Sequence, residues 1–444
     1  MLMKVPPSPI RPLLTKMLRQ ALASADAGQA LNRTLHRDGD ELAIGSQRYN
    51  LRDYKRIVVV GAGKATAVMA RAIEPILGRH LDDGLVVVKY GHRVPTKRIA
   101  VAEAGHPLPD RAGLAAARRV TALAAGLTGR DLLFLLLSGG ASSLMPAPVS
   151  GVTLSDKRRV TDQLLRCGAD IVDVNCVRKH LSTLKGGRLA ALSRATVVTL
   201  VLSDVIGDDL SAIGSGPTAP DPTTYRDAVA CLRRHRLWSS LPPGVREHLS
   251  SGVKGRVADT PKPGADLFRR IHHEIIGNNA MALSALTAAA RLAGWRTLLL
   301  PPFTKDAREA GAEMGALARR ILMQQRPVGP PCCVVAGGET TVRVTGSGRG
   351  GRTQEFAVAA AHAVAGLPGI YIAAVATDGS DGPTDAAGAL VNGETWPRAV
   401  RMGINLDAAL IRNDTYRALK RLNGHIMTGP TGTNVNDLYL LFVF

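Results

Sequence analysis

The chain has 444 residues, of which 45% are hydrophobic and 21% charged, a composition typical of a globular protein with two or three domains. No apolar run approaches the roughly 18 residues of a membrane-spanning helix, and the basic start lacks the apolar segment of a secretory signal, so a cytoplasmic protein is expected. The formal net charge of +20 comes mostly from dispersed arginines, without a basic block or a nucleic-acid-binding motif, which favours a basic cleft for small anions.

Strand-like and helical segments alternate along the chain. Apolar, β-rich runs predict strands at 56–60, 85–89, 131–137, 196–202, 332–336, 370–376 and 438–444. The stretches between them predict helices at 65–77, 111–127, 153–167, 279–293 and 306–324. This alternation indicates an α/β fold with a mostly parallel, doubly wound sheet. The polar segment 250–265 is typical of a linker, so we expect domains at 1–245 and 265–444.

Functional groups gather where the predicted strands end, the edge at which open α/β sheets bind ligands. Those ends carry Gly61-Ala62-Gly63-Lys64, Ser138-Gly139-Gly140-Ala141-Ser142-Ser143, Ser203-Asp204, Gly337-Gly338-Glu339 and Thr377-Asp378-Gly379-Ser380-Asp381. Turns alone do not require this combination of glycine, hydroxyl, carboxylate and lysine. The pattern therefore predicts an enzyme that handles phosphate.

The first of these turns, in "VVVGAGKATA", is close to two phosphate-binding motifs and matches neither. In a Walker A motif, Val58 would be a glycine and Ala65 a hydroxyl residue. In a dinucleotide fingerprint, Thr66 would be glycine or alanine, and an acidic residue would follow about 20 residues later, so NAD binding is disfavoured. A lysine at a helix start opposes the helix dipole, so we expect Lys64 to face an anion bound there rather than solvent alone.

A literal GxGxxG pattern occurs at 346–351, in "VTGSGRGGRTQEF". The pattern alone is weak evidence for a ligand site. Arg349 lies within it and Arg352 directly follows it, and guanidinium groups bind phosphate or carboxylate with two parallel hydrogen bonds. The segment therefore favours an anion site over a plain turn.

The segment "NCVRKHLSTLKGGRLA", residues 175–190, is rich in cations. It places these on one predicted helix and its end: Arg178, Lys179, His180, Lys185 and Arg188. The commonest interpretation is a solvated basic face with the two glycines as a C-terminal cap. Asn175 and Arg178, near the helix start, are the alternative, as ligands of a substrate carboxylate.

The metal that the sequence predicts is magnesium rather than zinc. The five cysteines form no CxxC pattern and are odd in number, which predicts reduced thiols. The acidic candidates are Asp204, Asp208, Asp209, Glu339, Asp378, Asp381 and Asp385. Phosphoryl transfer needs carboxylates for Mg²⁺ and for the proton of the attacking hydroxyl. Asp204 and Asp378 come soonest after strands and are the first candidates for both tasks.

Taken together, these segments resemble the glycerate 2-kinases with a C-terminal MOFRL domain. The likeness runs in order from about Val58 to the end, through "LLSGGASSLMPAP", "LSDVIGDDLSAIGSGPTAPDPTTY", "VVAGGETTVRV", "ATDGSDGPTDAAGALV" and "GPTGTNVNDLYLLFV". It implies a Rossmann-like N-terminal domain, a C-terminal domain with a mixed sheet and flanking helices, the MOFRL region at about 332–440, and an active site in the cleft between them. It also implies ATP-dependent, Mg²⁺-assisted phosphorylation of D-glycerate at the 2-hydroxyl.

The resemblance implies catalytic roles for Lys64 and Arg352. As a hypothesis, Lys64 and the 138–143 turn neutralise the transferred phosphoryl group, Arg352 with Arg178 holds the glycerate carboxylate, and Asp204 or Asp378 holds Mg²⁺ or acts as base. The remaining candidate binding residues are Gly61, Gly63, Ser138, Gly139, Gly140, Ser142, Asn175, Gly338, Glu339, Arg349, Gln354 and Asp381. The expected ligands are ATP and D-glycerate, without nucleic acid or membrane, in a monomer or homodimer.

Two other functions are considered. A hydroxypyruvate reductase using NAD(P)H is a label that family members often carry, and the failed dinucleotide fingerprint argues against it. A nucleotide-regulated or nucleic-acid-binding protein would bind with steep salt dependence and without turnover.

Overall fold

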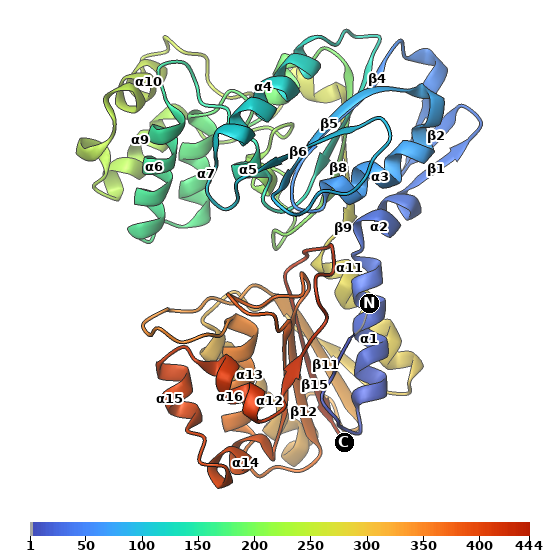
Figure 1. The fold of residues 1–444 in the computed structure, drawn as a ribbon, viewed down its shortest axis with the longest axis vertical. Coiled ribbons are helices and arrows are strands. Elements are labelled where there is room, and N and C mark those ends of the chain that lie inside the picture. The colour runs from blue at the N-terminus through green and yellow to red at the C-terminus, as the bar shows by residue number, and fades with distance from the viewer. Residues whose placement is uncertain (1–2) are drawn as a thin grey trace. The chain divides into compact units, whose positions relative to one another are not determined.

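The computed structural model describes residues 3–444, and residues 1 and 2, with which the predicted N-terminal domain begins, lie outside the described residues. By its internal contacts the chain forms two compact units. Unit 1 comprises Met1–Asp26 and Gly277–Phe444, and unit 2 comprises Ala27–Ile276. Figure 1 colours both by residue number.

Unit 2 is built on a six-stranded sheet with the order β6-β5-β4-β7-β8-β9. Its strands are β4 (Ile57–Ala62), β5 (Leu81–Lys89), β6 (Ala100–Ala104), β7 (Leu132–Leu137), β8 (Thr196–Leu202) and β9 (Ile271–Gly277). The neighbours from β6 to β8 all pair in parallel. Every residue of β4 and β7 is buried, because both strands are apolar on both faces, as in a sheet covered on both sides.

The helices of unit 2 fall into two sets. They are α2 (Ala27–Thr34), α3 (Thr66–Leu77), α4 (Arg111–Ala125), α5 (Ala141–Leu144), α6 (Leu154–Arg166), α7 (Ile171–His180), α8 (Arg188–Leu192), α9 (Tyr225–Arg234) and α10 (Pro243–Val253). Helices α3 and α4 pack on the sheet, whereas α6, α7, α9 and α10 gather beside it around a hydrophobic core of their own (Figure 1). A small antiparallel sheet, β1 (Leu35–Asp38), β2 (Glu41–Ile44) and β3 (Gln47–Asn50), precedes β4.

Unit 1 has a mixed sheet with the order β10-β11-β15-β12-β13-β14. Its strands are β10 (Arg296–Leu299), β11 (Cys332–Gly338), β12 (Ile370–Ala376), β13 (Gly388–Asn392), β14 (His425–Ile426) and β15 (Asp437–Val443). Among the described strand pairs of this sheet, only β10 and β11 are parallel, because the final strand β15 enters between β11 and β12 and runs antiparallel to both.

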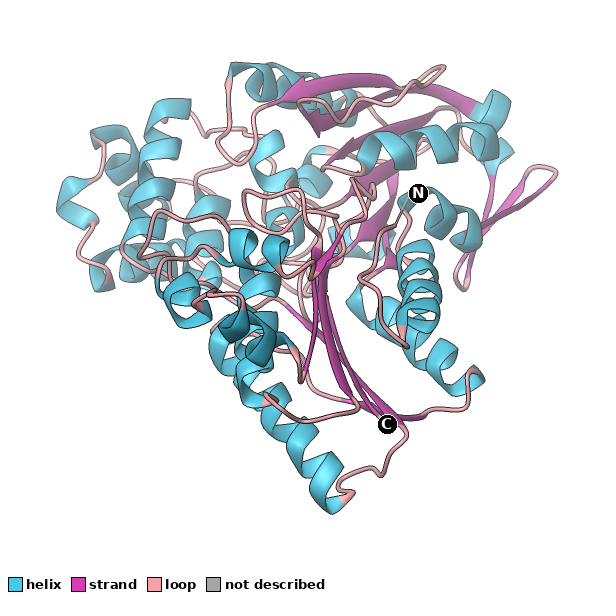
Figure 2. Cartoon of the chain, turned by 60° about the horizontal axis from the view of Figure 1, so that its bottom comes forward, coloured by secondary structure: helices cyan, strands magenta, loops and turns pink. Residues whose placement is uncertain are grey.

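Helices cover both faces of this sheet, which Figure 2 shows between two layers of helix. They are α1 (Arg11–Ser24), α11 (Asn279–Leu292), α12 (Ala307–Gln324), α13 (Arg352–Ala363), α14 (Thr395–Arg401), α15 (Leu406–Ile411) and α16 (Thr415–Arg421). Helix α13 packs against α12 and the sheet, and α1 packs against α11. The N-terminal helix α1 thus belongs to the unit that holds the C-terminal strand.

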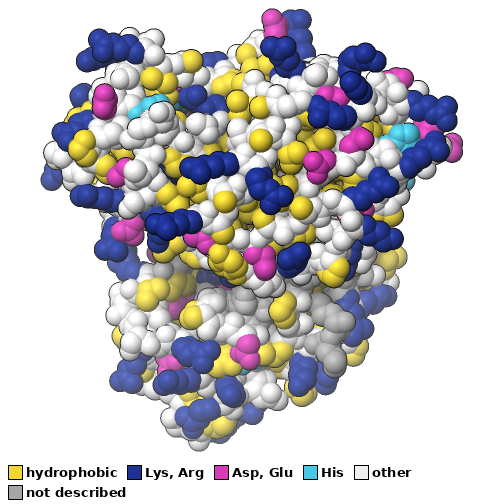
Figure 3. Space-filling model, turned by 45° about the horizontal axis from the view of Figure 1, so that its top comes forward, with side chains coloured by type: hydrophobic (Ala, Val, Ile, Leu, Met, Phe, Trp, Pro, Cys, Tyr) yellow, Lys and Arg dark blue, Asp and Glu magenta, His cyan; other side chains and the backbone are white. Residues whose placement is uncertain are grey.

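The predicted α/β fold, with one parallel and one mixed sheet, is confirmed. Strands β8 and β12 have the predicted bounds, and the other predicted strands and helices shift by a few residues. None of the helices formed by residues 3–444 is both long and apolar enough to cross a membrane. On the face drawn in Figure 3, Lys and Arg side chains are scattered rather than gathered into one patch.

Candidate functional site

In unit 2, the turns after β4 and β7 are hydrogen-bonded to each other. The backbone N–H of Lys64 donates to the carbonyl oxygen of Gly139 at 2.9 Å. The next N–H, that of Ala65, donates to Oγ of Ser138 at 3.0 Å. Two turns predicted separately to bind phosphate therefore form one structure, with the half-buried Lys64 between them.

Two glycines in these turns have no room for a side chain. Gly63 has φ +145°, and a Cβ there would lie 2.1 Å from Oγ of Ser138. Gly140 has φ +90°, and a Cβ there would lie 2.9 Å from the imidazole of His106 and 3.6 Å from Cγ of Lys64. Gly63 is therefore required by the close approach of the two turns, and Gly140 by its positive φ and the nearby imidazole of His106.

A group of cations and imidazoles surrounds Lys64. Lys89 ends β5, Nδ1 of His92 lies 3.3 Å from the carbonyl oxygen of Lys64, and His106 follows β6. Burial first, and then the charges of Lys64 and Lys89, lower the pKa of His106 to about 4, so its imidazole is neutral at pH 7. We call Lys64, Lys89, His92 and His106 the basic cluster.

The sequence interpretation missed the last three members of the basic cluster. The sequence did carry a signal for them, because Lys89 is the last residue of β5 and His92 and His106 follow strand ends by two or three residues. The edge strand β6, "AVAEA", was not predicted, so the position of His106 at the end of a strand went unrecognised.

Predicted residues Ser142 and Asn175 are joined through a third residue, Ser215. The hydroxyl of Ser215 donates to Oδ1 of Asn175 at 3.0 Å. Oγ of Ser142 lies 3.0 Å from Oγ of Ser215, and it is the donor because the proton of Ser215 is already used. Ser215 lies in the "SAIGSGPT" segment and was not singled out from the sequence.

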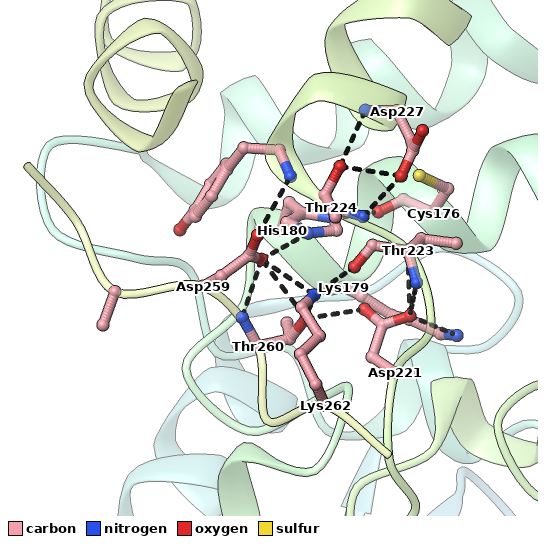
Figure 4. Close-up of polar contacts among 12 residues, drawn as sticks. Cys176, Lys179, His180, Asp221, Thr223, Thr224, Asp227, Asp259, Thr260 and Lys262 are labelled. Carbon is pink, nitrogen blue, oxygen red and sulfur yellow. Dashed lines mark hydrogen bonds and ion pairs between the residues drawn. The ribbon is translucent and has the colours of Figure 1, made fainter. Parts of the chain in front are cut away.

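The prediction that residues 175–190 form one helix with a solvated basic face is wrong. Helix α7 ends at His180, and Gly187 precedes the separate helix α8 instead of capping α7. Lys179 is buried and pairs with Asp221 at 3.2 Å, and Nε2 of His180 lies 3.0 Å from Oδ1 of Asp259 (Figure 4). These carboxylates come from distant segments, so the local sequence could not reveal the pairing.

The half-buried Asp204 follows β8 after one intervening residue. Strands β4, β7 and β8 are consecutive and parallel, so their carboxyl ends lie at one edge of the sheet. The structure therefore places Asp204 at the same sheet edge as Lys64 and the 138–143 turn. Arg178 lies on α7, one turn after Asn175, and its burial lowers the pKa of its guanidinium.

In unit 1, Arg352 is held by two acidic residues. Its Nε and Nη2 donate to Oδ2 and Oδ1 of Asp437 at 2.6 and 3.1 Å. Its Nη1 lies 3.0 Å from Oε1 of Glu339, whose other oxygen accepts from Asn436 at 3.0 Å. Burial raises the pKa of Asp437, and the charge of Arg352 opposes that rise. Asp437 and Asn436 lie in the "NVNDLY" segment and had been given no role.

The start of α13 is bonded to Asp381, which lies in the loop after β12. The buried carboxylate of Asp381 accepts from the N–H groups of Thr353 and Gln354 at 3.2 and 3.0 Å, and from Nε2 of Gln354 at 3.0 Å. These bonds satisfy donors at the helix start, next to Arg352. Their geometry is that of a helix cap that positions Arg352.

We expect Asp381→Ala to lower the free energy of unfolding by about 2 kcal/mol, because it leaves buried N–H groups without an acceptor. Thermal or urea unfolding of the variant and the wild type measures the difference in the free energy of unfolding. Asp385→Ala, at an exposed acid of the same loop, is the control and should change stability by less than about 0.5 kcal/mol. Equal stability of the two variants would contradict the cap.

The other candidates in unit 1 lie around the ends of β11 and β12. Gly338 ends β11 with φ +138° and precedes Glu339. Asp378 is half-buried and accepts from the N–H of Ser380 at 3.1 Å. Arg349 is exposed, donates to a backbone carbonyl at 3.1 Å, and lies over the ring of Tyr416, 5.0 Å from its centroid. The guanidinium of Arg352 is thus held by carboxylates, whereas that of Arg349 donates to a backbone carbonyl.

Comparison with known proteins matches two family models to the chain. The model described as "Domain of unknown function (DUF4147)" covers residues 13–250, and that of the MOFRL family covers 332–437. The glycerate 2-kinase of Pyrococcus horikoshii is 37% identical over 436 residues, which are 98% of this chain and 97% of the relative.

Two further comparisons bear on function. The crystal structure of glycerate kinase from Thermotoga maritima is 36% identical and covers 99% of this chain and 100% of its own, with a TM-score of 0.87. A protein of Agrobacterium vitis that carries a provisional hydroxypyruvate reductase name is 43% identical over 392 residues, 87% of each chain.

Proposed function

Because this chain belongs to the glycerate 2-kinase family, with its DUF4147 and MOFRL domains, we propose that it transfers the γ-phosphoryl group of ATP to the 2-hydroxyl of D-glycerate. The chain is a kinase, and the products are 2-phosphoglycerate and ADP. The reductase name of one relative does not favour the alternative, since the turn after β4 lacks a dinucleotide fingerprint.

The observation that carries the proposal is the basic cluster against the hydrogen-bonded turns of β4 and β7. Phosphoryl transfer is catalysed mainly by positioning and by neutralising charge on the phosphoryl oxygens. Lys64 supplies a fixed positive charge for this purpose. The neutral imidazole of His106 supplies a hydrogen-bonding group without adding a charge that would repel Lys64.

Two carboxylates suit Mg²⁺, which prefers oxygen ligands and usually takes one or two carboxylates with substrate phosphates. Asp204 in unit 2 and Asp378 in unit 1 follow strand ends and are both half-buried. Either carboxylate would hold the ion, and the bound ion would neutralise phosphate charge. Asp204, at the sheet edge that carries Lys64, is also the proposed acceptor of the proton from the 2-hydroxyl.

Arg352 is proposed as a residue that neutralises phosphate charge. Its bidentate pairing with Asp437 uses the edge of the guanidinium that a substrate carboxylate would otherwise take. Of the two arginines predicted from the sequence to hold the glycerate carboxylate, this favours Arg178 over Arg352.

An assay that couples ADP release to a spectroscopic signal tests the proposal. With ATP, Mg²⁺ and D-glycerate we expect turnover, and with L-glycerate much less. Hydroxypyruvate with NADPH should give no oxidation. NADPH oxidation without ATP-dependent turnover of glycerate would establish the reductase instead.

A further inference from the structure

Unit 2 brings together two buried lysines and a half-buried arginine. They are Lys157 on α6, Arg178 on α7 and Lys185 in the turn before α8. Lys185 is 0% exposed and Lys157 is 6% exposed. No ion pair within residues 3–444 involves any of the three at salt-bridge distance.

Lys185 is the extreme member of this set. Nζ of Lys157 donates to the carbonyl oxygen of Leu181 at 3.1 Å, whereas Nζ of Lys185 is buried without a hydrogen-bond partner in the described chain. Burial first, and then the charges of Lys157 and Arg178, hold the pKa of Lys185 well below its ordinary value. Buried amino groups in proteins are normally paired or hydrogen-bonded, so an unpartnered one is unusual, and an anion bound beside Lys185 would give its charged form a partner.

The neighbouring Lys179 shows how this fold otherwise buries a lysine. It is 4% exposed, and its Nζ lies 3.2 Å from Oδ1 of Asp221, which is 0% exposed. Figure 4 shows this pair within a network of carboxylates and hydroxyls. Lys185 lies only a short distance further along the chain and lacks such a carboxylate among its charged neighbours.

The three cations border the polar groups already described. Asn175 and Arg178 are three residues apart on α7 and so lie on one face of that helix. The N–H of Gly186, next to Lys185, donates to the carbonyl oxygen of Ser215 at 2.9 Å. The hydroxyl of Ser215 in turn links Asn175 to Ser142, on the turn that follows β7.

We propose that Lys185, together with Arg178 and Lys157, binds the carboxylate of the acceptor substrate. The inference rests on the proposed function, in which two anionic groups meet the enzyme. The phosphoryl group is assigned to the basic cluster around Lys64, which leaves the carboxylate of the 2-hydroxy acid. Arg178 offers it two parallel hydrogen bonds and Lys185 a point charge, in a site removed from water.

The test is Lys185→Met, which keeps the length of the side chain and removes its charge. We expect the KM for D-glycerate to rise about 100-fold, since a buried charged contact is lost, while the KM for ATP changes less than about 3-fold. We also expect the Tm of the free enzyme to rise by a few degrees, because a buried amino group without a hydrogen-bond partner is replaced by an apolar group.

A binding measurement without turnover complements the kinetics. D-glycerate alone should raise the Tm of the wild type and not that of Lys185→Met, whereas ATP alone should raise both. Arg178→Met, at a less buried position, should show the same loss, and it serves as the readout if Lys185→Met does not fold.

Lys179→Met is the matched control. It leaves the buried Asp221 unpaired, so we expect its Tm to fall by several degrees while the KM for D-glycerate stays within about 3-fold of the wild type. A purely structural role for Lys185 would make the two variants alike, with lower Tm and unchanged KM, and would overturn the proposal.

Two results separate the inference from the proposed function. In the first, the wild type forms ADP with D-glycerate, and Lys185→Met leaves the KM for D-glycerate unchanged or raises only the KM for ATP. The proposed carboxylate site is then wrong, and the proposed kinase activity is still supported. If the wild type forms no ADP with D-glycerate, the proposed function fails, and the carboxylate site fails with it.

Discussion

Replacement of Lys64 by alanine is expected to lower kcat about 1,000-fold, equivalent to about 4 kcal/mol of transition-state stabilisation. The reason is that Lys64 supplies the fixed charge at the point where the turns after β4 and β7 meet. Steady-state kinetics with saturating ATP and D-glycerate measure the loss. The KM for D-glycerate should change much less, since we propose that its carboxylate binds at Lys185 and Arg178.

Three controls accompany the Lys64→Ala variant: its thermal stability, the pKa of His106 and a second lysine variant. Lys64 is half-buried among like charges, so its loss should leave the Tm within a few degrees of the wild type. Because Lys64 is among the charges that lower the pKa of His106, that pKa should rise in the variant, as measured by NMR titration. Lys55→Ala, at an exposed residue before β4, should leave kcat unchanged. Near-normal turnover of Lys64→Ala would overturn the site.

Replacement of Arg352 by alanine is expected to abolish most activity and also to destabilise the fold. Asp437 is fully buried, and removing its cation leaves a buried carboxyl that is either an unpaired charge or must take up a proton, which costs about 3 kcal/mol at neutral pH. Thermal or denaturant unfolding measures the stability, and the ADP assay measures the activity.

The stability deficit of Arg352→Ala is expected to become smaller as the pH falls. Without Arg352, the folded-state pKa of Asp437 rises further above the unfolded value, because burial is no longer opposed. The folded state then takes up a proton more readily, so the stability deficit shrinks as the pH falls through that raised pKa. Arg349→Ala, at the exposed arginine of the same segment, should lose less than about 1 kcal/mol. A deficit that grows on acidification would contradict the Arg352–Asp437 account.

Local sequence patterns predicted most of the two large sheets. Strands such as β7 and β12 are continuous apolar runs bounded by glycine-rich turns, and their identity does not depend on distant residues. The small sheet of β1–β3 was missed although "HRDGDELAIGSQRY" carries an Asp-Gly turn signal, because its strands are short and polar. Strand β6 was missed because it is short and contains a glutamate, and His106, which follows it, was therefore missed as well.

The candidate site was predicted best where function depends on the backbone. Gly63, Ser138 and Gly140 are adjacent to strand ends in sequence and in space. What could not be predicted was the pairing of charges between distant segments. Arg352 with Asp437, and Lys179 with Asp221, are each decided by tertiary packing. The same packing buries Lys185 without a carboxylate, which local sequence had indicated as part of a solvated face.

The position of the phosphate on the product tests the central claim most directly. The wild type, incubated with ATP, Mg²⁺ and D-glycerate, should give 2-phosphoglycerate, identified by the coupling of its phosphorus to the single C2 proton in ³¹P NMR. A product with phosphorus coupled to the two C3 protons, or no phosphorylated product at all, would contradict the assignment.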